Sequence, residues 1–226
     1  QSAQQLQVLF DKIFRAQSVE FYRLLGVTLF LVAFGVVMVL SASSIDSLVA
    51  NSNSLWVFLK QFGFAIIGLL SLSIVSLLPV NRIRLGARPL FAITLVVQLL
   101  VFFFGKDVNG NRNWIDLFGF VTIQPSEFLK IAVILHVAAY LTSQQSYLDE
   151  PRVWHRSLGM IGIAVFLVII GKDLGTVIIM LIAFIGLLAL AGMPNKLLKQ
   201  VGLLLLVLIP AALMTSSSRM GRITAW

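Results

Sequence analysis

The sequence has no cysteine, only two histidines among its 226 residues, and a small share of charged residues. Without cysteine the chain can form neither disulfides nor thiolate metal sites. Charged residues make up 12% of the chain and hydrophobic residues 59%, and the mean hydropathy is +0.99. A soluble fold of this composition would leave most of its apolar surface in water, which excludes the ordinary soluble classes. The chain is therefore expected to lie in a lipid bilayer.

Long apolar runs divide the chain at regular intervals. Several runs of about 17 to 20 nearly uncharged residues match the length that a helix needs to cross the hydrocarbon core. Barrel strands would be shorter and would alternate between apolar and polar residues. We predict an all-α, polytopic transmembrane helical bundle with seven crossings. They are expected at about residues 24–40, 56–78, 90–104, 125–141, 158–170, 174–191 and 197–214.

The fifth run, at residues 158–170, is short for a full crossing. The alternative is a re-entrant half-helix, which would reverse the side of every later segment. Lys196 and Lys199 favour a full crossing, because they would otherwise lie outside, where short loops carry few cations.

The net charge of +8 would suggest nucleic acid as the partner of a soluble protein. Here the cations lie in short segments between apolar runs, so topology and anionic lipid explain them and no nucleic-acid partner is expected. Three closely spaced arginines form a predicted short cytoplasmic loop after the second run: Arg82, Arg84 and Arg88. The N-terminus is then also cytoplasmic. We predict a cytoplasmic amphipathic segment at residues 1–22 and a transmembrane domain at residues 23–226.

The stretch of residues 109–130 is the densest mixture of Asn, Trp, charge and helix-start residues in the chain. On the predicted topology, residues 109–124 form an outer loop. Five cations are expected on that outer face, where the positive-inside bias should have thinned them: Lys106, Arg112, Lys172, Arg219 and Arg222. Several such groups together favour a bound phosphate. The alternative is that they pair with neighbouring carboxylates or contact lipid headgroups.

Two segments read as helix starts. In Gln124-Pro125-Ser126-Glu127, proline suits the first helical position and the carboxylate suits the positive end of the helix dipole. Lys130 follows Glu127 by three residues, so an ion pair is expected. A lysine at membrane depth is a functional candidate, although so near the surface it could simply extend to water. Asp173 is predicted to be the N-cap of the next helix.

The aromatic and histidine side chains have ordinary structural explanations. Trp56, Trp114 and Trp154 fall at predicted membrane interfaces, where anchoring is the default role of tryptophan. His136 lies in the middle of a predicted crossing and is expected to be a structural, hydrogen-bonded imidazole.

Together these residues resemble the SEDS (shape, elongation, division and sporulation) family of FtsW/RodA-like bacterial membrane proteins. The matching pieces are Ser41-Ala42-Ser43, Asn109-Gly110 with Arg112 and Trp114-Ile115, Gln124-Pro125-Ser126-Glu127 with Lys130, and Asp173-Leu174-Gly175-Thr176. The Gln-Pro-Ser-Glu form and the long N-terminal extension favour the division branch, FtsW, over the elongation branch, RodA. In two places the chain departs from the family pattern. Asn113 separates the arginine from the tryptophan, and Lys172 replaces a common proline.

The resemblance implies a peptidoglycan glycosyltransferase that polymerises lipid II at the outer face of the bacterial cytoplasmic membrane, at the division septum, and releases polyprenyl pyrophosphate. We expect Arg112 and Lys130, with Lys172, to hold the pyrophosphate while Glu127 and Asp173 orient them. Trp114, Gln124 and Ser126 complete the expected substrate-binding set. Whether a divalent cation bridges the pyrophosphate is left open, since no carboxylate cluster has a spacing that demands a metal.

The resemblance also implies partners and alternatives. The expected partners are lipid II, a class B penicillin-binding protein that acts as the transpeptidase, other divisome or elongation proteins, and membrane lipids. One alternative function is a flippase that moves lipid II across the membrane. Another is a scaffold that recruits the transpeptidase through apolar helix faces.

The family's catalytic aspartate is expected to lie outside the sequence. Family members have about ten helices, and the long outer loop that carries this aspartate follows the seventh helix, close to where the sequence ends at Trp226. We therefore assign no catalytic residue to this segment. Residues 1–226 alone are predicted not to polymerise lipid II, and detection of glycan polymer made by the purified segment would contradict this.

Overall fold

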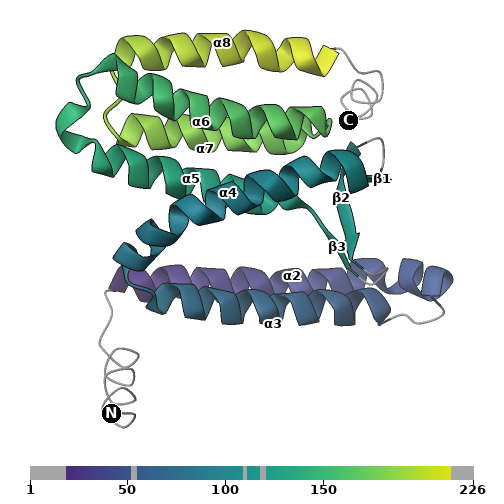
Figure 1. Ribbon diagram of the computed structural model, residues 1–226. Helices are drawn as coiled ribbons and strands as arrows, with labels where there is room; N and C mark the ends of the chain where they lie inside the picture. Colours follow the sequence, from purple (N-terminus) through teal and green to yellow (C-terminus); the bar gives the residue numbers. More distant parts are fainter. Residues whose placement is uncertain (1–18, 52–54, 109–110, 118–120, 215–226) are drawn as a thin grey trace. The chain divides into compact units, whose positions relative to one another are not determined.

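The computed structural model describes residues 19–51, 55–108, 111–117 and 121–214 (Figure 1). Most of the predicted amphipathic segment, as well as Arg219 and Arg222, lies outside this part of the chain. The chain divides into two compact units, residues 1–79 and residues 80–226, and each is described by itself.

The first unit is a pair of long helices, α2 (Val19–Asn51) and α3 (Trp56–Leu77), which pack side by side (Figure 1). On both helices, described hydroxyl groups bond within the helix to a carbonyl one turn earlier. Thr28 donates to the carbonyl of Leu24 at 2.8 Å, and Ser71 donates to that of Ile67 at 2.8 Å. Such local pairing allows polar side chains to lie in helices that face hydrocarbon.

Helix α2 is longer than predicted. The first crossing was expected to end near residue 40, but the helix continues through the serine-rich stretch to Asn51. No glycine or proline occurs between residues 36 and 51, so nothing in that stretch breaks the helix. The apolar run marks the part that can span a membrane and not the end of the helix.

The second unit contains five α-helices and a short 3₁₀ turn within the described residues. The helices are α4 (Val80–Phe104), α5 (Pro125–Ser143), α6 (Pro151–Ile170), α7 (Leu174–Leu190) and α8 (Asn195–Met214), and the turn is Gln145–Tyr147. Helix α4 corrects a second prediction, since the expected arginine loop is its first part. Arginine is a good helix former, and Pro79, immediately before Val80, ends one helix without preventing the next from starting.

The fifth apolar run is part of a full-length helix. Helix α6 starts at Pro151, well before the apolar run, and its 20 residues are long and apolar enough to cross a membrane. With this length, α6 is not too short for a full crossing, so its length no longer favours a re-entrant half-helix. Four other helical stretches in the described part of the chain also qualify as spans, namely Val19–Ala42, Trp56–Leu77, Val80–Phe104 and Pro125–Ser143. Helix α7 is apolar but shorter, with 17 residues. The predicted polytopic helical fold is confirmed.

A small antiparallel sheet replaces the predicted outer loop. Its strands β1 (Lys106–Val108), β2 (Asn111–Leu117) and β3 (Val121–Ile123) lie in the order β1-β2-β3. In the register, Lys106 is opposite Trp114 and Ile115 is opposite Ile123. These strands were not predicted, although Asn109-Gly110 is a strong hairpin signal in the sequence.

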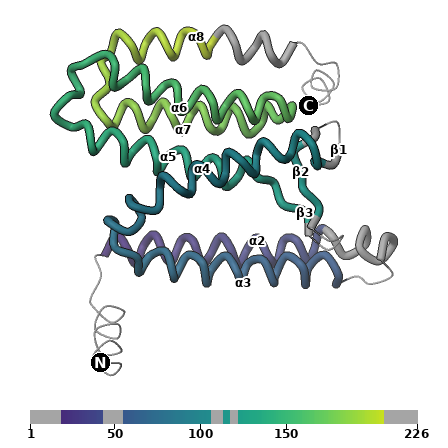
Figure 2. The backbone as a smooth tube through the Cα atoms, viewed as in Figure 1, coloured from purple at the N-terminus to yellow at the C-terminus, as the bar shows by residue number. Residues whose placement is uncertain are grey.

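The core of the second unit is built around α5, which contacts α4, α6 and α7 (Figure 2). Its side chains in the hydrophobic core are Leu129, Ala132, Val133, Val137 and Leu141. They pack against the buried faces of α6 and α7, which include Val168, Met180 and Phe184. This packing places the start of α5 beside the turn between α6 and α7. The sheet lies at this same end of the unit, which we call the sheet end (Figure 1).

Packing around α5 gives a direct test of this core. Leu129→Ala should lower the free energy of unfolding of the full-length protein by about 2–5 kcal/mol, because Leu129 is fully buried and the truncation leaves a cavity. The matched control is Ile131→Ala on the same helix, where the side chain is exposed and the change should be about 0.5 kcal/mol or less. Unfolding in detergent would measure both, and equal effects would contradict the packing.

Candidate functional site

Asp173 caps α7 at the sheet end, as predicted. Its Oδ1 atom accepts a hydrogen bond from the backbone N–H of Thr176 at 3.1 Å. Its Oδ2 atom accepts from the Thr176 hydroxyl at 2.7 Å. The side chain is only 8% exposed, so the carboxylate depends on these donors.

Gln124 joins the start of α5 to the start of α7. Its Nε2 atom donates to Asp173 Oδ2 at 2.5 Å and also lies 3.3 Å from the Thr176 hydroxyl oxygen. The two helix-start motifs found in the sequence therefore meet through side-chain hydrogen bonds. Asp173 was expected to orient a cation, but the partners that the structure shows for its carboxylate are neutral donors.

Glu127 and Lys130 form the predicted ion pair on the first turns of α5. The Lys130 Nζ atom lies 2.9 Å from Glu127 Oε2 and 3.1 Å from Oε1, so both carboxylate oxygens are engaged. The lysine side chain is 19% exposed and the glutamate side chain 51%. The ammonium is thus held in a covered position by a carboxylate that faces outward.

Ser126 lies in the same turn of α5 and is fully buried. Its hydroxyl has no hydrogen-bond partner among the described residues. A buried hydroxyl without a partner is uncommon in folded proteins. Ser126 is therefore placed close to the helix start but is not joined to the Gln124 and Asp173 network.

The β1–β2 hairpin contacts the α6–α7 turn, where Asn113 of β2 meets Gly171. The Asn113 side chain is 1% exposed, and neither of its amide atoms has a partner among the described residues. A Cβ atom on Gly171 would lie 1.8 Å from Asn113 Oδ1, so only glycine allows this approach. In the sequence, Asn113 stands out only as a departure from the family pattern. Its contact with Gly171 was not predicted.

The remaining predicted site residues lie near this contact. Arg112 belongs to β2, but its side chain is outside the described part of the structure. Trp114, also on β2, is half-buried. Lys172 lies in the turn, is exposed, and has a positive φ of 63°. Such a φ is uncommon for a residue other than glycine and shows that the turn is tightly constrained.

Packing tests the predicted role of one tryptophan and shows the surroundings of His136. The prediction of an interfacial anchor was wrong for Trp154, because it is buried in the bundle and its indole N–H donates to the carbonyl of Leu148 at 2.7 Å. His136 stacks on Phe91, with ring centroids 4.8 Å apart. Trp56 is exposed at the start of α3.

Histidine and carboxylate side chains do not gather into a metal site in the part of the chain that the structure describes. No group of three or more such residues is close enough there to hold an ion. The described site consists instead of two helix starts, an ion pair, two further cationic positions and several buried polar groups.

The chain is similar to known bacterial cell-cycle and cell-wall proteins. The sequence pattern of the cell cycle protein family of FtsW, RodA and SpoVE matches residues 22–226. A protein of Hydrogenovibrio crunogenus named "Probable peptidoglycan glycosyltransferase FtsW" is 29% identical over 204 residues, covering 90% of this chain and 52% of the relative. The protein of the same name from Mycobacterium bovis is 30% identical over 213 residues, covering 91% and 40%.

Solved structures share the fold. The rod shape determining protein RodA of Thermus thermophilus is 25% identical, with a TM-score of 0.57, over 79% of this chain and 58% of that one. A chain of a peptidoglycan synthase complex that coordinates polymerization and crosslinking is 21% identical, with a TM-score of 0.60, over 85% and 57%. This chain spans about half the length of the curated relatives that it matches.

The close approach of Gly171 and Asn113 predicts a specific clash and a specific rescue. Gly171→Ala should destabilise the protein by about 1–3 kcal/mol, because the new methyl group overlaps the Asn113 amide. Hydrogen exchange of residues 111–117 should become faster as the hairpin moves away. Asn113→Ala added to Gly171→Ala should restore slow exchange.

The control for that experiment is Gly162→Ala on α6, where an added Cβ meets no atom within 4 Å. This variant should leave hairpin exchange unchanged. If hydrogen exchange in the double variant were as fast as in Gly171→Ala alone, the clash with Asn113 would not be the reason that residue 171 must be glycine.

Proposed function

This chain belongs to the cell cycle protein family of FtsW, RodA and SpoVE, and from that premise we propose that the complete protein is a peptidoglycan glycosyltransferase. It polymerises lipid II at the outer face of the cytoplasmic membrane during cell division and releases polyprenyl pyrophosphate. The relatives named as peptidoglycan glycosyltransferases of the FtsW type support the proposal and its division branch.

The observation that carries the proposal is the meeting of two helix starts through Gln124 and Asp173. Helix N-termini carry partial positive charge and unpaired N–H groups, so their neighbourhood favours anions. Lys130 adds a full positive charge on the first turns of α5, and Lys172 adds another in the turn before α7. Positive charge fixed before the reaction stabilises a pyrophosphate that departs with its bonding electrons.

In the proposed reaction, an acceptor sugar hydroxyl attacks the anomeric carbon of the donor, and the bond from that carbon to the pyrophosphate oxygen breaks. The hydroxyl proton must pass to a general base. Asp173 does not suit that role, because it is buried and both of its oxygens already accept hydrogen bonds. The family resemblance implies a base outside this segment, and we propose that location.

The other predicted side chains receive supporting roles. Arg112 extends the cationic set from the hairpin, and Glu127 holds Lys130 in place. Gln124 positions the Asp173 carboxylate, and the half-buried Trp114 forms part of the substrate surface, whereas Ser126 is buried in the first turn of α5. A divalent cation at the pyrophosphate stays a proposal. Such an ion would arrive on the phosphates, as magnesium commonly does.

Partners and location follow from the same premise. We propose that the protein acts with a class B penicillin-binding protein, the transpeptidase, and with other division proteins at the septum. The relation between this fold and a chain of a peptidoglycan synthase complex is consistent with such a partner. The three arginines in the first part of α4 favour a cytoplasmic location for that end and for the N-terminus.

Transport of lipid II is the second candidate function. Lys130 lies in a helix that qualifies as a membrane span, and charged side chains in spans also mark translocation paths. A flippase would move labelled lipid II across liposomes without consuming it, whereas a glycosyltransferase would convert it to polymer.

The test uses fluorescent lipid II, the complete gene product and its transpeptidase partner. Arg112→Ala and Lys130→Ala should each reduce polymerisation by roughly 100-fold, because each removes charge that stabilises the leaving group. The matched control is Arg152→Ala, an exposed arginine at the start of α6 that pairs with Glu150 and should have no effect.

If both variants retained polymerisation and lipid II binding, the proposed pyrophosphate site would be wrong. If the folded wild type made no polymer but moved labelled lipid II across liposomes, the transport function would replace the enzymatic one.

A further inference from the structure

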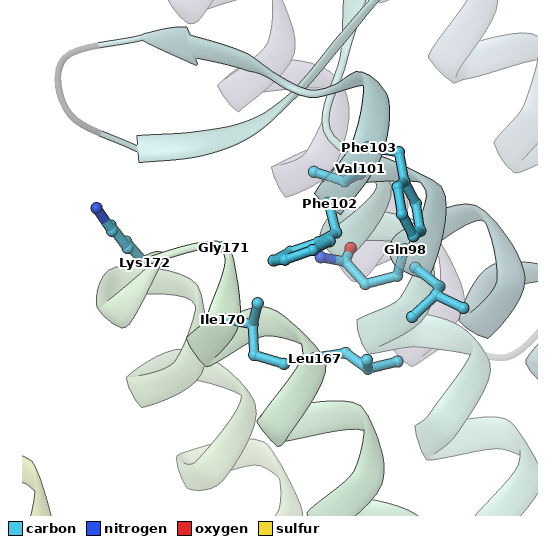
Figure 3. A pocket seen from close by; sticks show the side chains of 9 residues that line it. Gln98, Val101, Phe102, Phe103, Leu167, Ile170, Gly171 and Lys172 are labelled. Carbon is cyan, nitrogen blue, oxygen red and sulfur yellow. The ribbon is translucent and has the colours of Figure 1, made fainter.

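A cavity of about 550 Å³ lies between α4 and α6 at the sheet end of the second unit (Figure 3). Its volume falls in the range of small-molecule sites. Most of its wall is apolar. The lining residues are Gln98, Leu99, Val101, Phe102, Phe103, Leu167, Ile170, Gly171 and Lys172.

Gln98 is the exception in this apolar wall. Its side chain is 3% exposed, and its Oε1 atom has no hydrogen-bond partner among the described residues. In the view of Figure 3, the Gln98 amide lies beside Phe102 and above Leu167. A buried amide atom needs a partner, and the other buried polar group of α4, the Thr94 hydroxyl, already bonds to the carbonyl of Leu90 at 2.9 Å. The cavity wall therefore includes one amide group, whose buried oxygen lacks a partner among the described residues.

The rim of the cavity carries a cation. Lys172 lines it from the α6–α7 turn, and Figure 3 shows its side chain extending away from the aromatic wall. The aromatic side chains of Phe102 and Phe103 are themselves exposed on the surface of a helix that qualifies as a membrane span. A bound molecule would thus meet hydrocarbon-like surface, then an amide, then a positive charge.

We propose that this cavity binds one anionic glycerophospholipid of the bilayer. An acyl chain lies against Phe102 and Phe103, the glycerol ester reaches Gln98, and the phosphate lies at the level of Lys172. An ester oxygen accepts a hydrogen bond from the amide NH₂ of Gln98, which lies in the cavity wall. The proposal does not depend on the glycosyltransferase activity.

The Gln98 amide distinguishes a glycerophospholipid from a polyprenyl phosphate, the other phosphate-bearing lipid that the proposed function suggests. A polyprenyl phosphate has no polar atom beyond its phosphate, so its chain would leave Gln98 without a partner. A glycerophospholipid has ester groups between the phosphate and its chains. The unpaired amide therefore favours the glycerophospholipid.

The experiment measures the thermal stability of the full-length protein in detergent with added phosphatidylglycerol. The lipid should raise the Tm of the wild type, and Gln98→Leu should lose at least half of that shift, because leucine cannot bond to the ester. Leu167→Trp, which fills the cavity, should lose the shift as well. Thr94→Val is the matched control, since it also replaces a buried polar side chain of α4 with an apolar one but lies outside the cavity wall, and it should keep the shift.

A second readout locates the lipid directly. Phosphatidylglycerol with a photoreactive acyl chain should label peptides that contain residues 98–103 or 167–172 in the wild type and not in Leu167→Trp. An equal Tm shift in the wild type, Gln98→Leu and Leu167→Trp would overturn the proposal. So would stabilisation by polyprenyl phosphate but not by phosphatidylglycerol, which would assign the cavity to the substrate's chain.

Discussion

The hydrogen-bonded carboxylate of Asp173 is the interaction on which the sheet end depends. A carboxylate buried among apolar helices needs donors, because an unpaired charge in that environment is far more costly than a lost packing contact. Thr176 supplies two donors and Gln124 a third. The donors come from the beginnings of two different helices, so satisfying one carboxylate fixes both. Apolar packing has no direction, and it could not set this geometry alone.

The sequence predicted the fold well where the bilayer itself sets the rule. Apolar length located α3, α5 and α7 closely, because a spanning helix must satisfy its own backbone and needs a minimum length. It failed where polarity was taken as a sign of a loop. Arginines in α4 are compatible with a helix, and only glycine or proline would have marked an end. The strands β1 and β2 were missed because the Asn-Gly signal was not weighed as a turn.

The candidate site was predictable where its contacts are local. The Glu127 and Lys130 pair and the Asp173 cap follow from spacing along one helix, and the structure has both. The bond from Gln124 to Asp173, the contact of Asn113 with Gly171 and the burial of Trp154 join segments far apart in the sequence. No periodicity encodes such contacts. They follow from how the helices pack, which composition and spacing do not specify.

The pairing of Lys130 with Glu127 also determines what kind of anion site the start of α5 can be. The covered ammonium already has a counterion, and that counterion is the half-exposed partner of the two. An incoming phosphate would therefore displace Glu127 into water rather than approach a bare charge. Phosphate binding would exchange one anion for another. The net binding free energy would be the difference between the interaction of Lys130 with phosphate and its interaction with Glu127. When the ligand departs, Glu127 pairs with Lys130 again. This pairing lowers the free-energy cost of releasing the ligand.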